Sequence, residues 1–317
     1  MQSKYFFLKT FTSISSYNKA KSVITIGTFD GVHIGHKKIL ERVINCSQQL
    51  DCQSVVLTFF PHPRMVLQDS SSIKLLNTIN EKIMLLEKTG IDNLIIHPFN
   101  KEFSRLAAAD FVKTILVEQL NIQKIIIGHD HRFGRNRTAD INDLIEFGKE
   151  FNFEVEQISA QEINEIAISS TKIRNAILQG NISLANDYLG YNYFFSGTVI
   201  KGQQLGRTIG FPTANIQIEE EYKLIPKNGV YIVKSNHNNH VIFGMMNIGT
   251  RPTINGENQT IEVNFFDFDK DIYNETITIE ILEFIRDEHK FESVEALKNQ
   301  IQKDKKFTIE FLKNSIF

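Results

Sequence analysis

The feature that most constrains this chain is a change in the spacing of its apolar residues near residue 190. Before that point, helix-like stretches alternate with five apolar runs: VITIGTF, SVVLTFF, NLIIHPF, KIIIGH and FEVEQIS. Nearly continuous apolar strands that alternate with helices predict a parallel sheet covered by helices on both faces. We therefore expect an α/β, Rossmann-like domain over residues 1–187.

After that point the strand-like runs have no helices between them. They read FFSGTVIKG, GVYIVKSN, HVIFGMMNIG, TIEVNFFDF and ETITIEILEFI, and Gly, Asn and Asp turns separate them. This pattern predicts an antiparallel sheet, and closing that sheet into a barrel would remove its exposed edges. Helical spacing returns over residues 293–313. We expect a β-barrel domain with a C-terminal helix over residues 188–317.

The overall charge and the cysteine content exclude several classes of protein. A formal net charge of −2 over 317 residues argues against a nucleic-acid coat and against a membrane-surface protein. The two cysteines, Cys46 and Cys52, are too few for a disulfide framework, which favours a reducing cytoplasm. The opening MQSKYFFLKTF lacks the apolar core of a signal peptide, and no run approaches the roughly 20 apolar residues of a membrane span. We expect a cytoplasmic protein, monomeric or weakly oligomeric, with neither nucleic acid nor membrane as a partner.

The stretch GTFDGVHIGHKKIL places His33 and His36 where a strand ends and a helix begins. Ligands of α/β proteins bind at the carboxyl ends of strands, and the N-terminus of a helix attracts anions. Lys37 and Lys38 in the first helical turn would oppose the helix dipole unless a negative ligand balanced them. The pattern predicts that the two histidines stabilise charge on the phosphates of ATP. Asp30 either joins them or orients the loop.

This half contains three further candidate motifs, two of them at strand ends. SSTKIRNAI offers hydroxyl groups and Arg174 at a helix N-terminus, either as an ordinary cap or as a second phosphate cradle. GHDHRFGRNR carries Asp130 and Phe133 among three arginines, either as a solvated loop or as a site for phosphate or a flavin-type acceptor. FFPHPR holds His62 between two prolines. Because these segments can meet at one sheet edge, we expect them to share a ligand site.

The motif KGQQLGRTIGFPTANI in the second half contains three glycines. It forms either a hairpin loop or a tight loop whose backbone approaches a phosphate chain. If PTAN is extended, Thr213 and Asn215 lie on one face, and their neutral oxygens suit Mg²⁺. Glu262 lies in the apolar run TIEVNFF, where it either points outward or has a task that requires a buried carboxylate.

Several of these motifs together carry a family resemblance. In this order, GTFDGVHIGH, TFFPHP, GHDHRFG, ISSTKIR and KGQQLGRTIGFPTAN closely resemble the bacterial bifunctional riboflavin kinase/FMN adenylyltransferases, also called FAD synthetases. The likeness continues through GVYIV, MNIGTRPT and IEVNFFDFDKDIY, so it covers nearly the whole chain. It implies a nucleotidyltransferase-type domain followed by a six-stranded riboflavin kinase barrel. It also implies that riboflavin and ATP give FMN, and that FMN and ATP give FAD and pyrophosphate, with Mg²⁺.

The motifs and the resemblance together give two sets of site residues. In the adenylyl site, the residues toward ATP are Gly27, Phe29, Asp30, Gly31, His33, His36, Ser170, Thr171 and Arg174, and those toward the flavin are His62, Pro63, Asp130 and Phe133. In the kinase site, they are Lys201, Gly202, Gly206, Arg207, Gly210 and Pro212 toward ATP, Thr213 and Asn215 toward Mg²⁺, and Glu262 as the base. The catalytic residues implied are His33, His36 and Glu262.

The chain departs from the family's usual residues at three positions. His131 replaces the usual Phe, Asn264 replaces a His or a similar residue, and Asn274 replaces a Gly. Two other functions compete with the resemblance: a nucleotidyltransferase for another acceptor, such as a pantetheine or nicotinamide nucleotide, and a flavin-binding regulator without catalysis. The GRTIGFPTAN motif counts against the first, and the complete set of catalytic residue types counts against the second. The charge balance disfavours a tRNA-binding protein.

Overall fold

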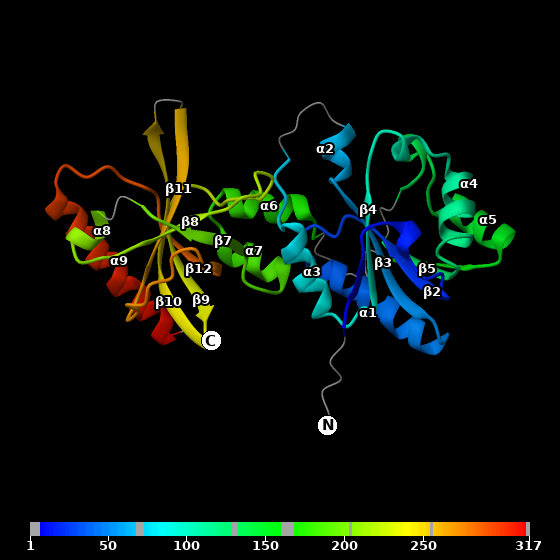
Figure 1. The fold of residues 1–317 in the computed structure, drawn as a ribbon, viewed down its shortest axis with the longest axis horizontal. Coiled ribbons are helices and arrows are strands. Elements are labelled where there is room, and N and C mark those ends of the chain that lie inside the picture. The colour runs from blue at the N-terminus through cyan, green and yellow to red at the C-terminus, as the bar shows by residue number, and fades with distance from the viewer. Residues whose placement is uncertain are drawn as a thin grey trace, which may run out of the picture. The chain divides into compact units, whose positions relative to one another are not determined.

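The computed structural model of this chain describes residues 7–67, 73–128, 132–159, 168–202, 205–253 and 256–314 (Figure 1). Contacts within the chain divide it into two units, Met1–Ser170 and Thr171–Phe317. Each unit contains one sheet. The predicted functional boundary between residues 187 and 188 stays a prediction.

The first unit is built on a parallel sheet of six strands in the order β1-β4-β3-β2-β5-β6. The strands are β1 (Lys9–Phe11), β2 (Ser22–Ile26), β3 (Gln53–Phe60), β4 (Asn93–Pro98), β5 (Ile122–Gly128) and β6 (Glu154–Ile158). The helices are α1 (Ile34–Gln49), α2 (Pro63–Leu67), α3 (Ile79–Glu87), α4 (Ala108–Asp110) and α5 (Ile141–Phe151). Short helical turns are η1 (Ile14–Ser16), η2 (Phe103–Arg105) and η4 (Arg135–Arg137). The predicted α/β class is therefore confirmed.

The order of the strands creates a switch point beside β2. The chain runs from β2 to β3 and β4 on one side, then crosses back to place β5 on the other side of β2. Right-handed crossovers put helices on opposite faces when the direction reverses. Figure 1 shows α1 and α3 on one side of the sheet and α4 and α5 on the other. Open α/β sheets bind ligands at such a switch point, so the loop after β2 lies where a ligand is expected.

One helical segment of this unit is not an ordinary α-helix. The apolar spacing of residues 107–119 fits one continuous α-helix, but α4 passes into a π-helix, η3 (Phe111–Val117). Its wider hydrogen bonding is visible in the bond from the Glu118 N–H to the Lys113 carbonyl, five residues back. Apolar residues of η3 pack on the sheet: Phe111, Val112, Ile115 and Leu116 are all part of the buried core.

The second unit is a closed barrel with strand order β10-β11-β8-β7-β12-β9. Its strands are β7 (Phe194–Ile200), β8 (Ala214–Gln217), β9 (Gly229–His237), β10 (His240–Thr253), β11 (Gly256–Phe265) and β12 (Thr276–Arg286). Its helices are α6 (Ser170–Leu178), which begins at the last residue of the first unit, α7 (Ile182–Leu189), α8 (Leu205–Thr208) and α9 (Val294–Asn314). All pairings are antiparallel, which confirms the predicted barrel.

Helix α7 is bonded to the barrel. The Asn186 side-chain amide donates to the Ile281 carbonyl on β12 at 3.0 Å, and its oxygen accepts the Tyr193 N–H at 2.7 Å. One side chain thus joins α7, the segment that leads into β7, and a strand of the barrel. This helix therefore belongs structurally with the second unit.

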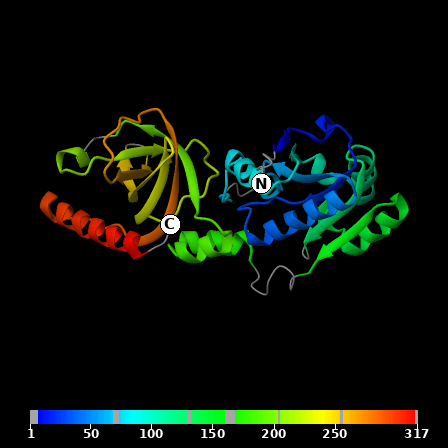
Figure 2. The same cartoon turned by 90° about the horizontal axis from the view of Figure 1, so that it is seen from below.

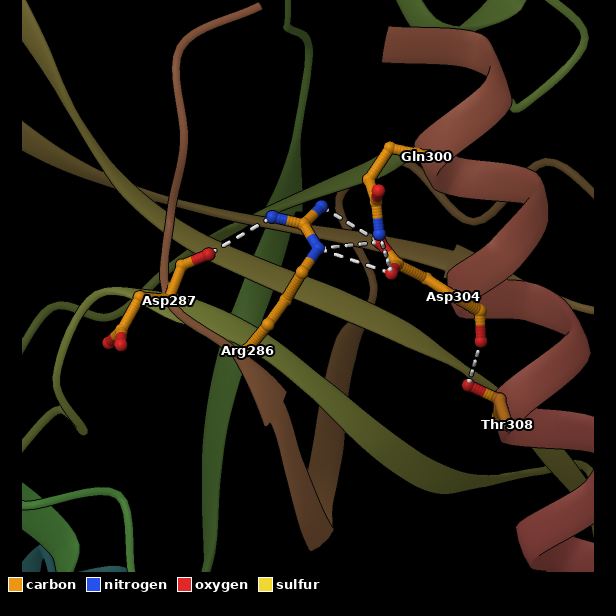
Figure 3. Close-up of polar contacts among 5 residues, drawn as sticks. All are labelled: Arg286, Asp287, Gln300, Asp304 and Thr308. Carbon is orange, nitrogen blue, oxygen red and sulfur yellow. Dashed lines mark hydrogen bonds and ion pairs between the residues drawn. The ribbon is translucent and has the colours of Figure 1, made fainter. Parts of the chain in front are cut away.

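Helix α9 lies along the outside of the barrel (Figure 2) and is joined to it by a buried ion pair (Figure 3). Asp304 on α9 accepts hydrogen bonds from Arg286 Nε and Nη2, the latter at 2.8 Å. Gln300 donates to the same carboxylate at 2.8 Å, and the Thr308 hydroxyl donates to the Asp304 carbonyl. The Asp304 side chain is only 5% exposed, so this cluster replaces water around the carboxylate. Among the residues that the structure describes, no helix has both the length and the apolar character needed to cross a membrane.

Candidate active sites

The loop after β2 has an unusual backbone. Phe29, Gly31 and Val32 have φ angles of 46°, 89° and 35°, in the left-handed region. Glycine enters this region freely, whereas for residues with a side chain it costs roughly 1–2 kcal/mol each. The loop is stabilised by its neighbours, because the Thr28 carbonyl accepts from Lys82 Nζ at 2.7 Å and from Thr58 Oγ1 at 3.2 Å.

Asp30 is a second attachment point of this loop. Its buried carboxylate accepts the Leu76 N–H at 2.9 Å and the Asn77 N–H at 3.4 Å, in the segment that leads into α3. Its carbonyl accepts from the Ser170 hydroxyl at 2.8 Å, so the SSTKIR motif begins beside the loop. These contacts support the interpretation in which Asp30 orients the loop.

His33 and His36 lie together at the start of α1. His33 is the N-cap residue, and its Nδ1 accepts the His36 N–H at 3.3 Å. The two rings are stacked, with centroids 3.6 Å apart. Because His33 Nδ1 is an acceptor, the neutral ring carries its proton on Nε2, which can donate to an anion. The N-terminus of a sixteen-residue helix favours that anion as well.

The protonation of His36 follows from its surroundings. Removal of the ring from water holds the pKa of His36 well below its usual value, and the positive charges of His33 and Lys82 lower this pKa further. His36 is therefore a neutral imidazole at physiological pH. Its Nδ1 is buried and has no hydrogen-bond partner among the described residues. The histidine pair can thus act as hydrogen-bond donors.

The other residues predicted for this site have varied surroundings. His62 is buried, its Nδ1 accepts the Arg64 N–H at 3.1 Å, and Pro63 begins α2. Phe133 is buried in the core against Phe111, with ring centroids 6.1 Å apart. Asp130 and His131 lie outside the described residues. Thr171 and Arg174 begin the second unit and remain members of the predicted adenylyl site on the sequence alone.

The barrel brings several of the predicted kinase residues together where β8 and β11 pair. Glu262 and Asn215 are directly opposite each other in the two paired strands. The Thr213 hydroxyl donates to Glu262 Oε2 at 3.2 Å. Gly202 completes the group, since a Cβ there would lie 2.2 Å from Asn215 Nδ2. The Glu262 carboxylate, the Thr213 hydroxyl and the Asn215 amide thus lie close together, and a side chain at position 202 would collide with the amide.

The segment before Thr213 has its own supports. The Asn264 side-chain amide donates to the Pro212 carbonyl at 2.7 Å, so this departure from the family has a structural role. Gly206 accepts the Phe211 N–H at 2.8 Å, and a Cβ at Gly206 would lie 2.2 Å from the Phe211 oxygen. Gly210 has a φ of 86°. Lys201 and Arg207, the two predicted cations of the loop, are exposed.

Sequence reasoning missed two residues near these sites. Lys82 contacts the loop after β2, although it lies 54 positions further along the chain. The local signal is weak: Lys82 lies three and four residues before Leu85 and Leu86, so it shares the buried face of α3 with them. Asn247 on β10 is directly opposite Glu262, on the same side of the sheet. Strand register is a long-range property, and no local pattern indicates it.

Two family models match the chain, one described as FAD synthetase over residues 15–172 and one described as riboflavin kinase over residues 189–312. Relatives called bifunctional riboflavin kinase/FMN adenylyltransferase include one from Buchnera aphidicola subsp. Schizaphis graminum, 40% identical over 90% of this chain and 92% of that protein. Another from Bacillus subtilis is 37% identical over 93% of this chain and 94% of that protein. A solved structure described as a macrolide-efflux protein from Streptococcus pneumoniae matches with a TM-score of 0.87 and 30% identity, covering 98% of this chain and 99% of that one. Each of these three likenesses spans both units.

Proposed function

Because this chain belongs to the family of bifunctional riboflavin kinase/FMN adenylyltransferases, it makes FMN from riboflavin and FAD from FMN, and we propose which residues serve each reaction. Adenylyl transfer takes place at the loop after β2, with the functional boundary between residues 187 and 188. Phosphorylation takes place where β8 and β11 meet. The observation that carries this assignment is the contact between Thr213 and Glu262 beside Asn215.

Adenylyl transfer joins two anions. A phosphate oxygen of FMN attacks the α-phosphorus of ATP, and pyrophosphate leaves. The nucleophile is already ionised, so the site needs charge stabilisation more than a base. His33 and His36 donate hydrogen bonds to the phosphates at the positive end of α1, and Ser170, Thr171 and Arg174 complete the site. Mutual repulsion between the substrates is reduced by these donors.

Riboflavin phosphorylation starts from a neutral nucleophile. The ribityl hydroxyl attacks the γ-phosphorus of ATP, its proton passes to the Glu262 carboxylate, and ADP leaves. Thr213 and Asn215 fit Mg²⁺ by donor type, because both offer neutral oxygens beside the carboxylate. Bound there, Mg²⁺ would neutralise charge on the ATP phosphates. Lys201 and Arg207 add positive charge from the loop that carries Gly202, Gly206 and Gly210.

The experiment that tests the function incubates the purified protein with riboflavin and ATP, with and without Mg²⁺, and separates FMN from FAD by chromatography. We expect FMN to appear first and FAD to follow, and both to depend on Mg²⁺. If FAD forms from supplied FMN but riboflavin is never phosphorylated, the kinase assignment is wrong. Size-exclusion chromatography of the same sample tests the expected monomer or weak oligomer.

The role of Glu262 is tested by Glu262→Gln, which keeps the shape and removes the base. The rate of FMN formation should fall by roughly 10²–10⁴-fold. FAD synthesis from supplied FMN should persist, because it uses other residues. Glu219→Gln, at an exposed position of the same unit, is the matched control. A Glu262→Gln enzyme that keeps more than about half of the wild-type rate, against the loss expected for a missing base, would show that another group accepts the proton.

A further inference from the structure

Lys82 occupies a position where a lysine is rare. It lies on the buried side of α3 with Leu85 and Leu86, and only 3% of its surface is exposed. The helix itself has no need of this charge, because Thr78 and Glu81 already form a capping box at its N-terminus. Lysine is almost never fully buried without a partner or a task.

The ammonium group reaches the loop that carries the histidines. Lys82 Nζ donates to the Thr28 carbonyl at 2.7 Å, one residue before the left-handed Phe29. The Leu76 N–H, a few residues before α3, donates to the Asp30 carboxylate at 2.9 Å. One short segment of chain thus holds the loop on both sides of Phe29. A strained loop persists only when its surroundings determine it in this way.

The charge of Lys82 also acts on the site beyond its hydrogen bond. After burial of the ring and the charge of His33, the positive charge of Lys82 is a further cause that lowers the pKa of His36. The Asp30 carboxylate interacts favourably with the same ammonium group. Lys82 therefore links the backbone of the loop, its buried aspartate and the second histidine.

A purely structural role does not account for a lysine here. Burial lowers the pKa of Lys82 to about 8 despite the favourable charge of Asp30, so keeping the ammonium group charged at this position costs stability. We propose that Lys82 is a positioning residue for adenylyl transfer, which holds the loop after β2 in the conformation that presents His33 and His36 to the nucleotide. This inference rests on the proposed function of that loop.

The test compares Lys82→Met with wild type in the full-length protein. Lys88→Met is the matched control, because Lys88 is the exposed C-cap residue of the same helix. For each protein, kcat and KM are measured for FAD formation, with FMN and with ATP varied. Riboflavin phosphorylation, the midpoint of thermal unfolding and hydrogen exchange of the amides of residues 27–33 are measured on the same samples.

We expect Lys82→Met to lower kcat for FAD formation by roughly 10- to 100-fold, the size expected when reacting groups are misplaced by about 1 Å. Its unfolding midpoint should be equal to or above that of wild type, its kinase rate unchanged, and exchange in residues 27–33 faster. Lys88→Met should match wild type in every measurement. If the Met variant does not fold, Lys82→Gln, which keeps one neutral donor, replaces it in the same comparison.

Two results would overturn the inference in different ways. If wild type forms FAD and the Lys82 variant does so with the same kcat, the positioning role is wrong and the proposed function stands. If wild type forms no FAD from FMN and ATP, the proposed function fails and the inference fails with it. A variant that loses both activities in parallel with a lowered unfolding midpoint would show that Lys82 is a structural residue only.

Discussion

Replacing Asp304 with leucine removes the carboxylate that joins α9 to the end of β12 (Figure 3). Arg286 and Gln300 then lose their acceptor, although Arg286 keeps the bond from its Nη1 to the Asp287 carbonyl. Removing one partner of a buried ion pair costs about 3–5 kcal/mol. The Arg286 side chain is 18% exposed, so water can reach part of the guanidinium group once its partner is removed. We therefore expect a loss of stability at the lower end of this range, about 3 kcal/mol.

The double variant separates the charge from the shape. Arg286→Met together with Asp304→Leu removes both charges and fills the space with apolar side chains. Replacing a whole buried pair in this way is often neutral, so we expect a stability within about 1 kcal/mol of wild type. Asp287→Leu is the control, because Asp287 makes an exposed ion pair with Lys227 whose loss costs less than about 1 kcal/mol.

The assay must report on α9 alone, because two units need not unfold together. Hydrogen exchange of the amides of α9 (Val294–Asn314) does this, and the amides of β2 to β5 in the first unit provide an internal reference. A loss of about 3 kcal/mol corresponds to roughly 10²-fold faster exchange at about 1.4 kcal/mol per tenfold change. If Asp304→Leu leaves exchange in α9 unchanged, or if the double variant is as unstable as the single one, the ion pair does not hold the helix.

Three further predictions concern the two sites. His36→Ala should lower FAD formation by roughly 10²-fold, as for a lost transition-state donor, while FMN formation stays near wild type in the same chromatographic assay; equal loss of both would indicate a structural histidine. Gly202→Ala puts a Cβ 2.2 Å from Asn215 Nδ2, so FMN formation should fall by roughly 10-fold or more and need more Mg²⁺, measured as a Mg²⁺ titration of the kinase rate. Burial lowers the pKa of Lys82 from 10.5 to about 8, although the charge of Asp30 acts in the opposite direction. Between these two values the unfolded chain binds more protons than the folded chain does, so the free energy of unfolding rises with pH. Relative to Lys82→Met, wild type should gain about 2 kcal/mol between pH 8 and pH 10 in urea titrations; no gain would show that the ammonium group is not desolvated.

The sequence predicts the strands that carry a long apolar signal and misses the short ones. Strands β2 to β5 have nearly continuous apolar runs, whereas β1 has three residues and β8 has four, too few for any periodicity. The π-helical turn of η3 was missed for another reason. Its apolar spacing also fits an ordinary helix, and only packing on the sheet decides between the two.

The candidate sites divide along similar lines. Residues inside contiguous motifs, such as His33, His36 and Thr213, were recognisable because their spacing is local. Lys82 was not, because a lysine in a helix resembles any solvent-facing residue until the fold brings it to Thr28. Phe133 is buried against Phe111, a position that an aromatic residue in a loop of arginines does not indicate, and its contact with the flavin stays a prediction.

The pairing of the barrel's first strand with its last has a consequence for the order in which the chain can fold. Strand β7 pairs with β8 on one side and with β12 on the other, so the ring cannot close until residues 276–280 have been synthesised. The first unit has no such delay, because all six of its strands precede residue 170. During synthesis the parallel sheet can therefore form while the edge of β7 that pairs with β12 is still unpaired. Unpaired strand edges recruit other chains, so a product that stops before β12 should associate with copies of itself more than the full-length chain does.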